Sequence, residues 1–332
     1  MMHKITHDLN HDEMTDLMTA MMSGDMSDDD IIAALNALKE KGETITEITA
    51  AAQVMRSFAT GVKVNKPSLV DIVGTGGDGL NTFNISTATA IVVAASGGIV
   101  AKHGNRSFSS KSGSADVLDA AGVNLDLNAE QIAQLIEQIN IGFIFAPKHH
   151  GAMKHVMKAR KQMGTRTIFN LLGPLTNPSG ATHHLIGVYD KALCQPFAEV
   201  LKQLGSQHAL IVHSEDGMDE ISIAAPTFVC ELNDGDITEY TITPEQFGLE
   251  RQSLDSLVID DAQQSLAIIH QVFDDQPGAA RDIVILNSGA ALYAANITNN
   301  LEQGIALAKQ TIEQRKAQEK LAELISLSQQ LI

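Results

Sequence analysis

The sequence predicts an α/β protein in which a small helical domain precedes a larger domain with a mainly parallel central sheet. The first 60 residues read as three helices separated by glycines. From residue 68 onward, short apolar runs alternate with helical runs, which indicates a parallel sheet covered by helices on both faces. A chain of 332 residues is long enough to bury a sizeable core in such a fold.

The three N-terminal helices are predicted from their capping residues. Asn10, Ser27 and Thr44 each offer a side-chain oxygen to the free N–H groups of a first helical turn. The expected helix ends are the glycines Gly24, Gly42 and Gly61. Methionines give the first helix an apolar face that suits the core and a contact with a second subunit equally: Met14, Met18, Met21 and Met22.

The larger domain is predicted from the runs that follow. The expected parallel strands are residues 69–73, 99–102, 142–145, 185–188 and 209–212. Helical runs lie at 115–121, 129–139 and 193–204, a hairpin is expected over 228–242, and one long polar helix from about residue 301. Because parallel sheets bind ligands at the carboxyl ends of their strands, we expect the functional residues in the loops after these strands.

Composition excludes several classes of protein. The formal net charge of −17 argues against general nucleic-acid binding, which needs a basic surface. The first dozen residues contain acids and no apolar core, unlike a secretory signal, and the longest apolar stretch is shorter than the roughly 18 residues of a membrane span. Cys194 and Cys230 form no disulfide framework and lack metal-ligand spacing. We therefore expect a soluble cytoplasmic protein that binds neither membranes nor nucleic acid.

The first predicted strand leads into a glycine-rich loop, VGTGGDGLNTFNIST at residues 73–87. Glycines let successive N–H groups converge on an oxyanion, and Asn84, Ser86 and Thr87 stand where a helix begins, so its dipole faces the same point. The pattern is neither a Walker A motif nor a dinucleotide fingerprint. A glycine-rich surface turn is the alternative, but the strand–loop–helix context favours phosphate or pyrophosphate binding.

Two further loops carry charged and polar residues. KHGNRSFSSKSGS at 102–114 suits a loop around a phosphorylated ligand, with Lys102 as a point charge, although a flexible polar loop has the same composition. HSEDGMDEIS at 213–222 places Asp219 beside Glu220 after a glycine turn. Alone the pair would more often be a solvated turn. Facing a phosphate loop, it predicts a Mg²⁺ site, because Mg²⁺ prefers oxygen ligands.

A basic stretch at residues 148–166 contains six lysines and arginines and no acid. In an acidic protein such a stretch suits a small anion, although a solvated helix face is the alternative. The histidine pairs at 149–150 and 183–184 are not expected to bind metal, because adjacent side chains point in different directions.

Taken together, the motifs resemble the anthranilate phosphoribosyltransferase family. They are GTGGD at 74–78, NIST at 84–87, KHGNRS at 102–107, SGSADVL at 112–118, RTIFNLLGPLTNP at 166–178 and DGMDE at 216–220. The similarity extends from KGET at 41–44 to LNSGAALYAA at 286–295 in the family's order. Gly151 stands where the family often has proline, and the last helix lacks a frequent glycine, but neither departure removes a contacting group.

The resemblance implies a nucleoside phosphorylase/phosphoribosyltransferase-like fold. A helical domain of residues 1–66, joined by a helical segment at about 155–182, would be hinged to an α/β domain of residues 67–332 that binds the phosphoribosyl donor. A homodimer interface would lie on the helical part. The implied reaction is the Mg²⁺-dependent transfer of the 5-phosphoribosyl group from 5-phosphoribosyl 1-diphosphate to the amine of anthranilate, releasing pyrophosphate, in tryptophan biosynthesis.

The resemblance also implies roles for individual residues, none of them a general base. The metal would be held by Ser86, Asp219 and Glu220, and anthranilate would be contacted by Gly74, Asn105 and Arg160. The donor would be bound by Gly74, Gly77, Asp78, Thr82, Asn84, Ile85, Ser86, Thr87, Lys102, His103, Gly104, Asn105, Arg106, Ser107, Phe108, Ser109, Ser110 and Ser114.

Two other functions are alternatives to this interpretation. A pyrimidine nucleoside phosphorylase-like enzyme would have a similar architecture, but that family is longer by a C-terminal domain. A non-catalytic relative that binds nucleic acid would share the fold, but the net charge and the acidic pair Asp219 and Glu220 speak against it.

Overall fold

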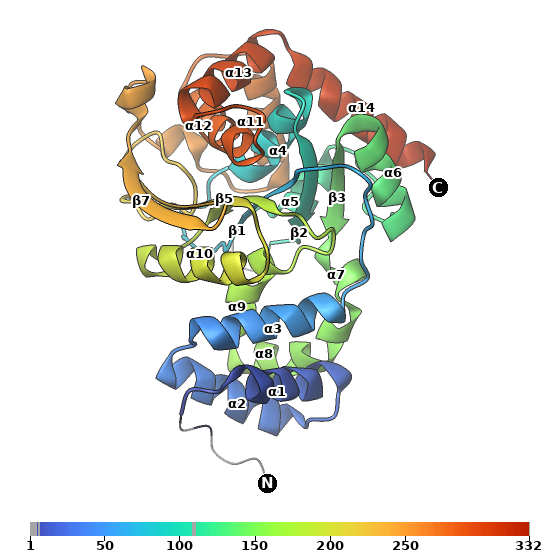
Figure 1. Cartoon of the computed structure of the whole chain (residues 1–332). Helices are drawn as coiled ribbons and strands as arrows, with labels where there is room; N and C mark the ends of the chain where they lie inside the picture. Colours follow the sequence, from blue (N-terminus) through green and yellow to red (C-terminus); the bar gives the residue numbers. More distant parts are fainter. Residues whose placement is uncertain (1–4, 6, 108–110, 332) are drawn as a thin grey trace.

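The computed structural model describes residues 5, 7–107 and 111–331 (Figure 1). A helical part lies on one side of a central sheet, and the C-terminal helices lie on the other (Figure 1). In the described residues the sheet has seven strands in the order β3-β2-β1-β4-β5-β6-β7. The predicted α/β fold class is therefore present.

The helical part combines segments from two regions of the sequence: α1 (His11–Ser23), α2 (Asp28–Lys41), α3 (Ile45–Ser57), α8 (Lys154–Met163) and α9 (Ile168–Leu172). Asn10 and Thr44 form the predicted capping boxes. The predicted end of α3 at Gly61 is wrong, because the helix ends at Ser57. Beyond it, the N–H of Thr60 donates to the carbonyl of His149 at 2.8 Å, so the chain has already left the helical path.

The sheet contains the five predicted parallel strands and the predicted hairpin. The parallel strands are β1 (Leu69–Gly74), β2 (Ile99–Gly104), β3 (Ile141–Phe145), β4 (His183–Gly187) and β5 (His208–Ser214), followed by the antiparallel β6 (Thr227–Asn233) and β7 (Asp236–Ile242). β2 continues two residues beyond its predicted end. Lys102 and His103 therefore lie inside a strand and are buried, rather than in the loop where the sequence placed them.

The remaining helices are α4 (Ile85–Ala95), α5 (Ser114–Ala120), α6 (Ala129–Ile139), α7 (Ala146–His149), α10 (Cys194–Gln203), α11 (Ala262–Phe273), α12 (Ala279–Ala294), α13 (Leu301–Glu313) and α14 (Lys316–Gln330). The predicted single helix from about residue 301 is wrong. The chain breaks at Arg315, whose φ of +57° is left-handed and cannot continue a right-handed helix.

Two buried apolar clusters fill the molecule, one on each side of the sheet. The first joins α4, α6 and α11–α14 to the sheet. The second joins α1–α3, α8 and α9 to α10 and to the other face of β4–β6. Four methionines of α1 are fully buried in this second cluster: Met14, Met18, Met21 and Met22. The methionine face of α1 is thus part of the chain's own core.

Candidate active site at the switch point of the sheet

The strand order reverses between β1 and β4, and two glycines are paired there. Gly74 ends β1 and lies opposite Gly187, which ends β4. Asp219, from the loop after β5, covers both. A Cβ on Gly187 would lie 1.5 Å from the carbonyl oxygen of Asp219, and one on Gly74 would lie 2.5 Å from its Oδ2. Only a residue without a side chain fits at either position, so these glycines admit the acidic loop to the place where α/β sheets bind ligands.

The glycine-rich loop runs from the end of β1 to the start of α4. Gly76 and Gly77 have left-handed φ values of +66° and +82°, and the N–H of Gly76 donates to Asp219 Oδ2 at 2.7 Å. The loop is thereby attached to the acidic loop before any ligand binds. Asp78 lies near Asp219, because its charge is one cause of the raised pKa of that carboxyl.

The N-terminus of α4 follows the loop, as the sequence predicted. Asn84 is its N-cap, and its Oδ1 accepts from the N–H of Thr87 at 2.9 Å and from Ser86 Oγ at 3.2 Å. Ile85 is buried, so its backbone rather than its side chain faces the loop. Thr82 pairs with Val258 in an isolated bridge. The helix N-terminus and the loop therefore provide N–H groups suited to an anion.

Asp219 and Glu220 place two carboxyl groups beside this helix. Burial, and next the charge of Asp78, raise the pKa of Asp219 to about 7. Burial and the neighbouring Asp219 raise the pKa of Glu220 well above its usual value, and Lys102 opposes that rise. Two carboxyl groups that resist ionisation for lack of compensating charge are suited to a divalent cation.

Lys102 lies beneath the acidic pair. Its Nζ donates to the carbonyl of Ile72 at 2.6 Å and to Ser86 Oγ at 3.1 Å. Burial lowers the pKa of Lys102 to about 8, against the opposing charges of Asp71 and Glu220. The lysine thus fixes the hydroxyl of Ser86 next to the carboxyl groups.

The residues fit Mg²⁺ better than a transition metal. Among the described residues, no three histidine, cysteine, aspartate or glutamate side chains converge as a metal site would require. Mg²⁺ usually takes one or two protein carboxylates and completes its shell with water and substrate phosphate oxygens. Asp219 and Glu220 match that donor set, whereas a zinc site would need further nitrogen or sulfur ligands.

A buried asparagine holds the acidic loop from behind. Asn287 in α12 accepts from the N–H of Ile221 at 3.0 Å and donates to the carbonyl of the same residue at 2.8 Å. Its side chain also donates to the carbonyl of Ile283, within its own helix, at 2.9 Å. Since Ile221 directly follows Glu220, both peptide groups of the acidic loop's last turn are fixed by one amide.

The second predicted binding loop follows β2. The carbonyl of Asn105 accepts from the N–H of Ala115 at 3.2 Å, and a Cβ on Gly104 would lie 2.2 Å from Ser114 Oγ, so the loop closes tightly on the start of α5. The N–H of Ser107 donates to Asp116 at 2.9 Å. Phe108, Ser109 and Ser110 lie outside the described residues.

Arg106 and His103 are engaged within the protein. Arg106 pairs with Asp116 at 3.0 Å and with Asp119 at 2.8 Å. The His103 ring lies 5.2 Å from the ring of His150, and burial lowers the pKa of His103 to about 3. The neutral imidazole of His103 therefore belongs to the interior beneath the loop.

The basic stretch does not act as one group. Lys148 pairs with Asp126 at 2.7 Å, and Lys158 pairs with Asp28. Arg160 is different, because none of the ion pairs among the described residues involves it, and its guanidinium lies 5.2 Å from the Phe169 ring. Burial lowers the pKa of Arg160. A largely buried guanidinium without an acid partner suits a ligand that brings its own negative charge.

Comparison with known proteins bears directly on these features. A family model described as "Glycosyl transferase family, a/b domain" matches residues 66–318, and one described as "Glycosyl transferase family, helical bundle domain" matches residues 3–59. Anthranilate phosphoribosyltransferase from Thioalkalivibrio sulfidiphilus is 58% identical over 294 residues, which are 89% of this chain and 87% of the relative. The chain belongs to the anthranilate phosphoribosyltransferase family.

Solved structures of the same family share the fold. Anthranilate phosphoribosyltransferase from Thermus thermophilus is 40% identical, with a TM-score of 0.93 over 97% of each chain. The Saccharomyces cerevisiae enzyme, solved in complex with PRPP and Mg, is 27% identical, with a TM-score of 0.88 over 97% of this chain and 94% of that one. The predicted fold, a helical domain with a larger α/β domain, is thereby confirmed.

Several residues of this family site were not singled out from the sequence. Gly187 and Asn287 hold the acidic loop, and Arg166 and Tyr189 contact the glycine loop. Arg166 and Asn287 lie in quoted family motifs, so the motifs contained a signal for them. Gly187 gave none, because its role depends on a residue 32 positions away in the sequence.

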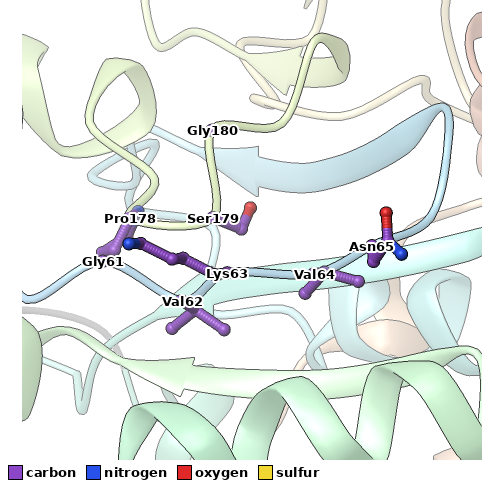
Figure 2. Close-up of a pocket in the computed structure, with 8 residues that line it drawn as sticks. All are labelled: Gly61, Val62, Lys63, Val64, Asn65, Pro178, Ser179 and Gly180. Atoms are coloured by element: carbon purple, nitrogen blue, oxygen red, sulfur yellow. The ribbon is translucent and has the colours of Figure 1, made fainter.

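A separate groove lies at the opposite edge of the sheet (Figure 2). It has a volume of about 500 Å³ and lies between residues 61–65, which lead into β1, and residues 178–180, which lead toward β4. The N–H of Val62 donates to the carbonyl of Pro178 at 3.0 Å, joining the two segments. These segments connect the helical part to the sheet. The described helices include none long and apolar enough to cross a bilayer.

Proposed function

We propose that this chain catalyses the transfer of the 5-phosphoribosyl group from 5-phosphoribosyl 1-diphosphate to anthranilate, in tryptophan biosynthesis. The amine nitrogen forms a bond to carbon 1 of the ribose, the bond from that carbon to the diphosphate oxygen breaks, and the amine loses one proton. The observation that carries this proposal is the acidic pair Asp219 and Glu220, placed against the glycine loop at the switch point. Relatives at 58% and 54% identity carry the name of this activity.

Donor binding is assigned to the two loops and the helix N-terminus between them. The proposed contacts are Gly74, Gly77, Asp78, Thr82, Asn84, Ile85, Ser86, Thr87, Lys102, His103, Gly104, Asn105, Arg106, Ser107, Ser114 and, outside the described residues, Phe108, Ser109 and Ser110. Buried Lys102 and His103 would act through the backbone and through Ser86 rather than from the surface. The converging N–H groups at the start of α4 support this assignment.

The metal is assigned to Asp219 and Glu220, with Ser86 beside them. When bound there, Mg²⁺ would neutralise negative charge that develops on the departing diphosphate. The protein's own contribution is to hold both carboxyl groups rigidly, through Gly74 and Gly187 on one side and Asn287 on the other. The raised pKa of each carboxyl supports the binding of a compensating cation.

Anthranilate is assigned to Arg160, with Gly74 and Asn105. The guanidinium of Arg160 would bind the carboxylate, which orients the amine toward the ribose. An aromatic amine is neutral near pH 7, so no strong general base is required. Positive charge develops on the sugar ring as in glycoside cleavage, and catalysis rests on orientation of the two substrates and stabilisation of the leaving group.

We further propose that residues 1–66 and about 155–182 rotate as one body against the remainder of 67–332, closing the site. The joined segments at Val62 and Pro178 support a hinge there, and the core shared with α10 limits the rotation. A homodimer through the helical part is supported by two exposed apolar side chains on it, Phe58 and Met157. Light scattering should give about twice the 35.5 kDa chain mass, and a monomer would contradict this arrangement.

The buried free thiols of Cys194 and Cys230 support a cytoplasmic location.

The deciding experiment is an assay with anthranilate, 5-phosphoribosyl 1-diphosphate and Mg²⁺. Anthranilate fluorescence should fall with time, and the fall should stop when EDTA is added. A parallel reaction with uridine and phosphate should release no uracil. Folded protein that consumes no anthranilate, or that cleaves uridine instead, would refute the proposal and favour the nucleoside phosphorylase alternative.

A further inference from the structure

Arg166 connects the helical part to the glycine loop across the domain boundary. It lies between α8 and α9, and its Nη2 donates to the carbonyl of Gly77 at 2.7 Å. A Cβ on Gly77 would lie 2.3 Å from the same Nη2. The guanidinium therefore packs directly onto the backbone of the loop, at a residue whose φ of +82° already favours glycine.

Tyr189 fixes the other face of this guanidinium. The guanidinium carbon of Arg166 lies 3.6 Å from the centroid of the Tyr189 ring, so the two planar groups are in direct contact. Tyr189 follows β4, and its N–H donates to Thr75 Oγ1 at 3.1 Å, while the N–H of Thr75 donates to the carbonyl of Gly187 at 2.9 Å. The end of β4 thus holds the start of the loop through Thr75 and its middle through Arg166.

A glycine-rich loop needs such support. Glycine loses more backbone freedom on ordering than any other residue, and three glycines of this loop, Gly76, Gly77 and Gly79, have left-handed φ values. Any freedom that the free protein retains in the loop must be lost when the diphosphate binds, which weakens binding. A contact that orders the loop beforehand removes that cost.

We propose that Arg166 is a positioning residue that, stacked on Tyr189, holds residues 75–79 in the conformation that binds the diphosphate of the donor. This inference rests on the proposed function and adds a residue to it. Because Arg166 follows α8, which carries Arg160, the same short segment reaches both substrates. The stacked planar face is the essential property, since a lysine could supply the charge but neither the stacking nor the fixed geometry of the fork.

Calorimetric titration of the protein with 5-phosphoribosyl 1-diphosphate in Mg²⁺ tests the proposal without turnover. Arg166→Ala should weaken binding about tenfold, the size of effect expected for one charge-assisted hydrogen bond. Arg166→Lys should be nearly as weak. Tyr189→Leu should weaken binding to a similar extent and Tyr189→Phe much less. The double variant Arg166→Ala, Tyr189→Leu should be no weaker than the worse single variant.

Lys161→Ala is the matched control, because it removes an exposed cation from the same basic stretch and should not change donor binding. Hydrogen exchange of the amides of residues 75–79 in the free protein should be faster in Arg166→Ala, and exchange in β1 should stay the same, which separates loop ordering from loss of fold.

Three outcomes would overturn the inference. One is full binding by Arg166→Lys, which would make Arg166 a simple charge for the diphosphate. Another is an unaffected Tyr189→Leu, or additive losses in the double variant. The third is unchanged exchange in residues 75–79. If the parent protein itself fails to bind the donor, the proposed function fails instead, so the two failures are distinguishable.

Discussion

The two sides of the candidate site are built in opposite ways. On the donor side, the acidic loop is pressed against Gly74 and Gly187, donated to by Gly76 and fixed by Asn287. On the α8 side, Arg160 extends alone, with a ring contact to Phe169 and no acid partner among the described residues.

The difference indicates which interactions are made before substrates bind. A diphosphate with its metal has several charged oxygens, so a rigid set of ligands recognises it and stabilises its departure. A carboxylate on a flat ring needs one guanidinium, whose missing partner the substrate supplies. The donor side should therefore tolerate displacement poorly, and the α8 side should lose affinity for one substrate alone.

Removal of the acidic pair should have the largest effect. Asp219→Asn with Glu220→Gln should lower kcat by about 10²- to 10³-fold, as losses of leaving-group stabilisation do, while thermal unfolding stays cooperative. Steady-state rates over a Mg²⁺ titration measure this. In the single variants, part of the loss should return at high Mg²⁺. Glu215→Gln, an exposed acid of the same loop, is the control, and an unchanged Mg²⁺ requirement in both single variants would place the ion elsewhere.

Displacement of the loop should come next. Gly187→Ala puts a methyl group 1.5 Å from the Asp219 carbonyl oxygen, so the loop must move, and kcat/KM for the donor should fall about 10- to 100-fold. Gly151→Ala is matched to it, because an added Cβ there meets nothing within 4 Å. Equal activities of the two variants would show that the close packing of Asp219 is unimportant.

Loss of Arg160 should affect one substrate. Arg160→Ala should raise KM for anthranilate by about tenfold to a hundredfold, since a charge-assisted hydrogen bond contributes roughly 1.5 to 3 kcal/mol. KM for the donor should change much less. Initial-rate measurements with each substrate varied in turn, beside Lys161→Ala, separate the two constants. The opposite pattern would mean that the two sides have been exchanged.

The smallest effect concerns the interior between the two sides. Burial lowers the pKa of His103 to about 3, of His150 to about 4 and of His184 to about 3. The folded state keeps these rings neutral while the unfolded state binds protons below about pH 6.5, so the free energy of unfolding should fall as pH falls from 6.5 to 4. Each ring contributes at most about 1.4 kcal/mol per pH unit.

His184→Gln tests this linkage. Thermal unfolding followed by calorimetry between pH 7 and 5 should show a shallower loss of stability in the variant than in the parent, by about one proton's worth of slope. His7→Gln replaces an exposed histidine and serves as the reference. If both variants follow the slope of the parent, the ring of His184 takes up protons in the folded state.

Local sequence signals predicted most of the fold. The capping residues Asn10 and Thr44, the strand–loop–helix pattern around Asn84 and the hairpin turn at 234–235 depend on neighbours within a few positions, and the structure has each of them. The break at Arg315 could not be predicted, because no glycine or proline marks it and a non-glycine residue rarely adopts a positive φ.

The site was predicted in its residue types but not in its construction. The sequence indicated the glycine loop and the acidic pair. That Asp219 lies on Gly74 and Gly187 depends on the register between β1 and β4, which joins residues more than 100 positions apart. Likewise, the burial of Lys102 depends on two more residues of strand than its local sequence indicated. The contacts of Arg166 depend on tertiary packing alone.

The core that α1–α3 share with α10 also bears on how members of such a family recombine. Met18 of α1 belongs to the same apolar cluster as Val200 of α10 and Ile211 of β5. A chimera joined at residue 66 would therefore divide one packed interior between two parents, and its helices would meet an underside of the sheet that evolved with different neighbours. Exchange of the N-terminal segment should succeed only when α8, α9 and α10 are inherited with it.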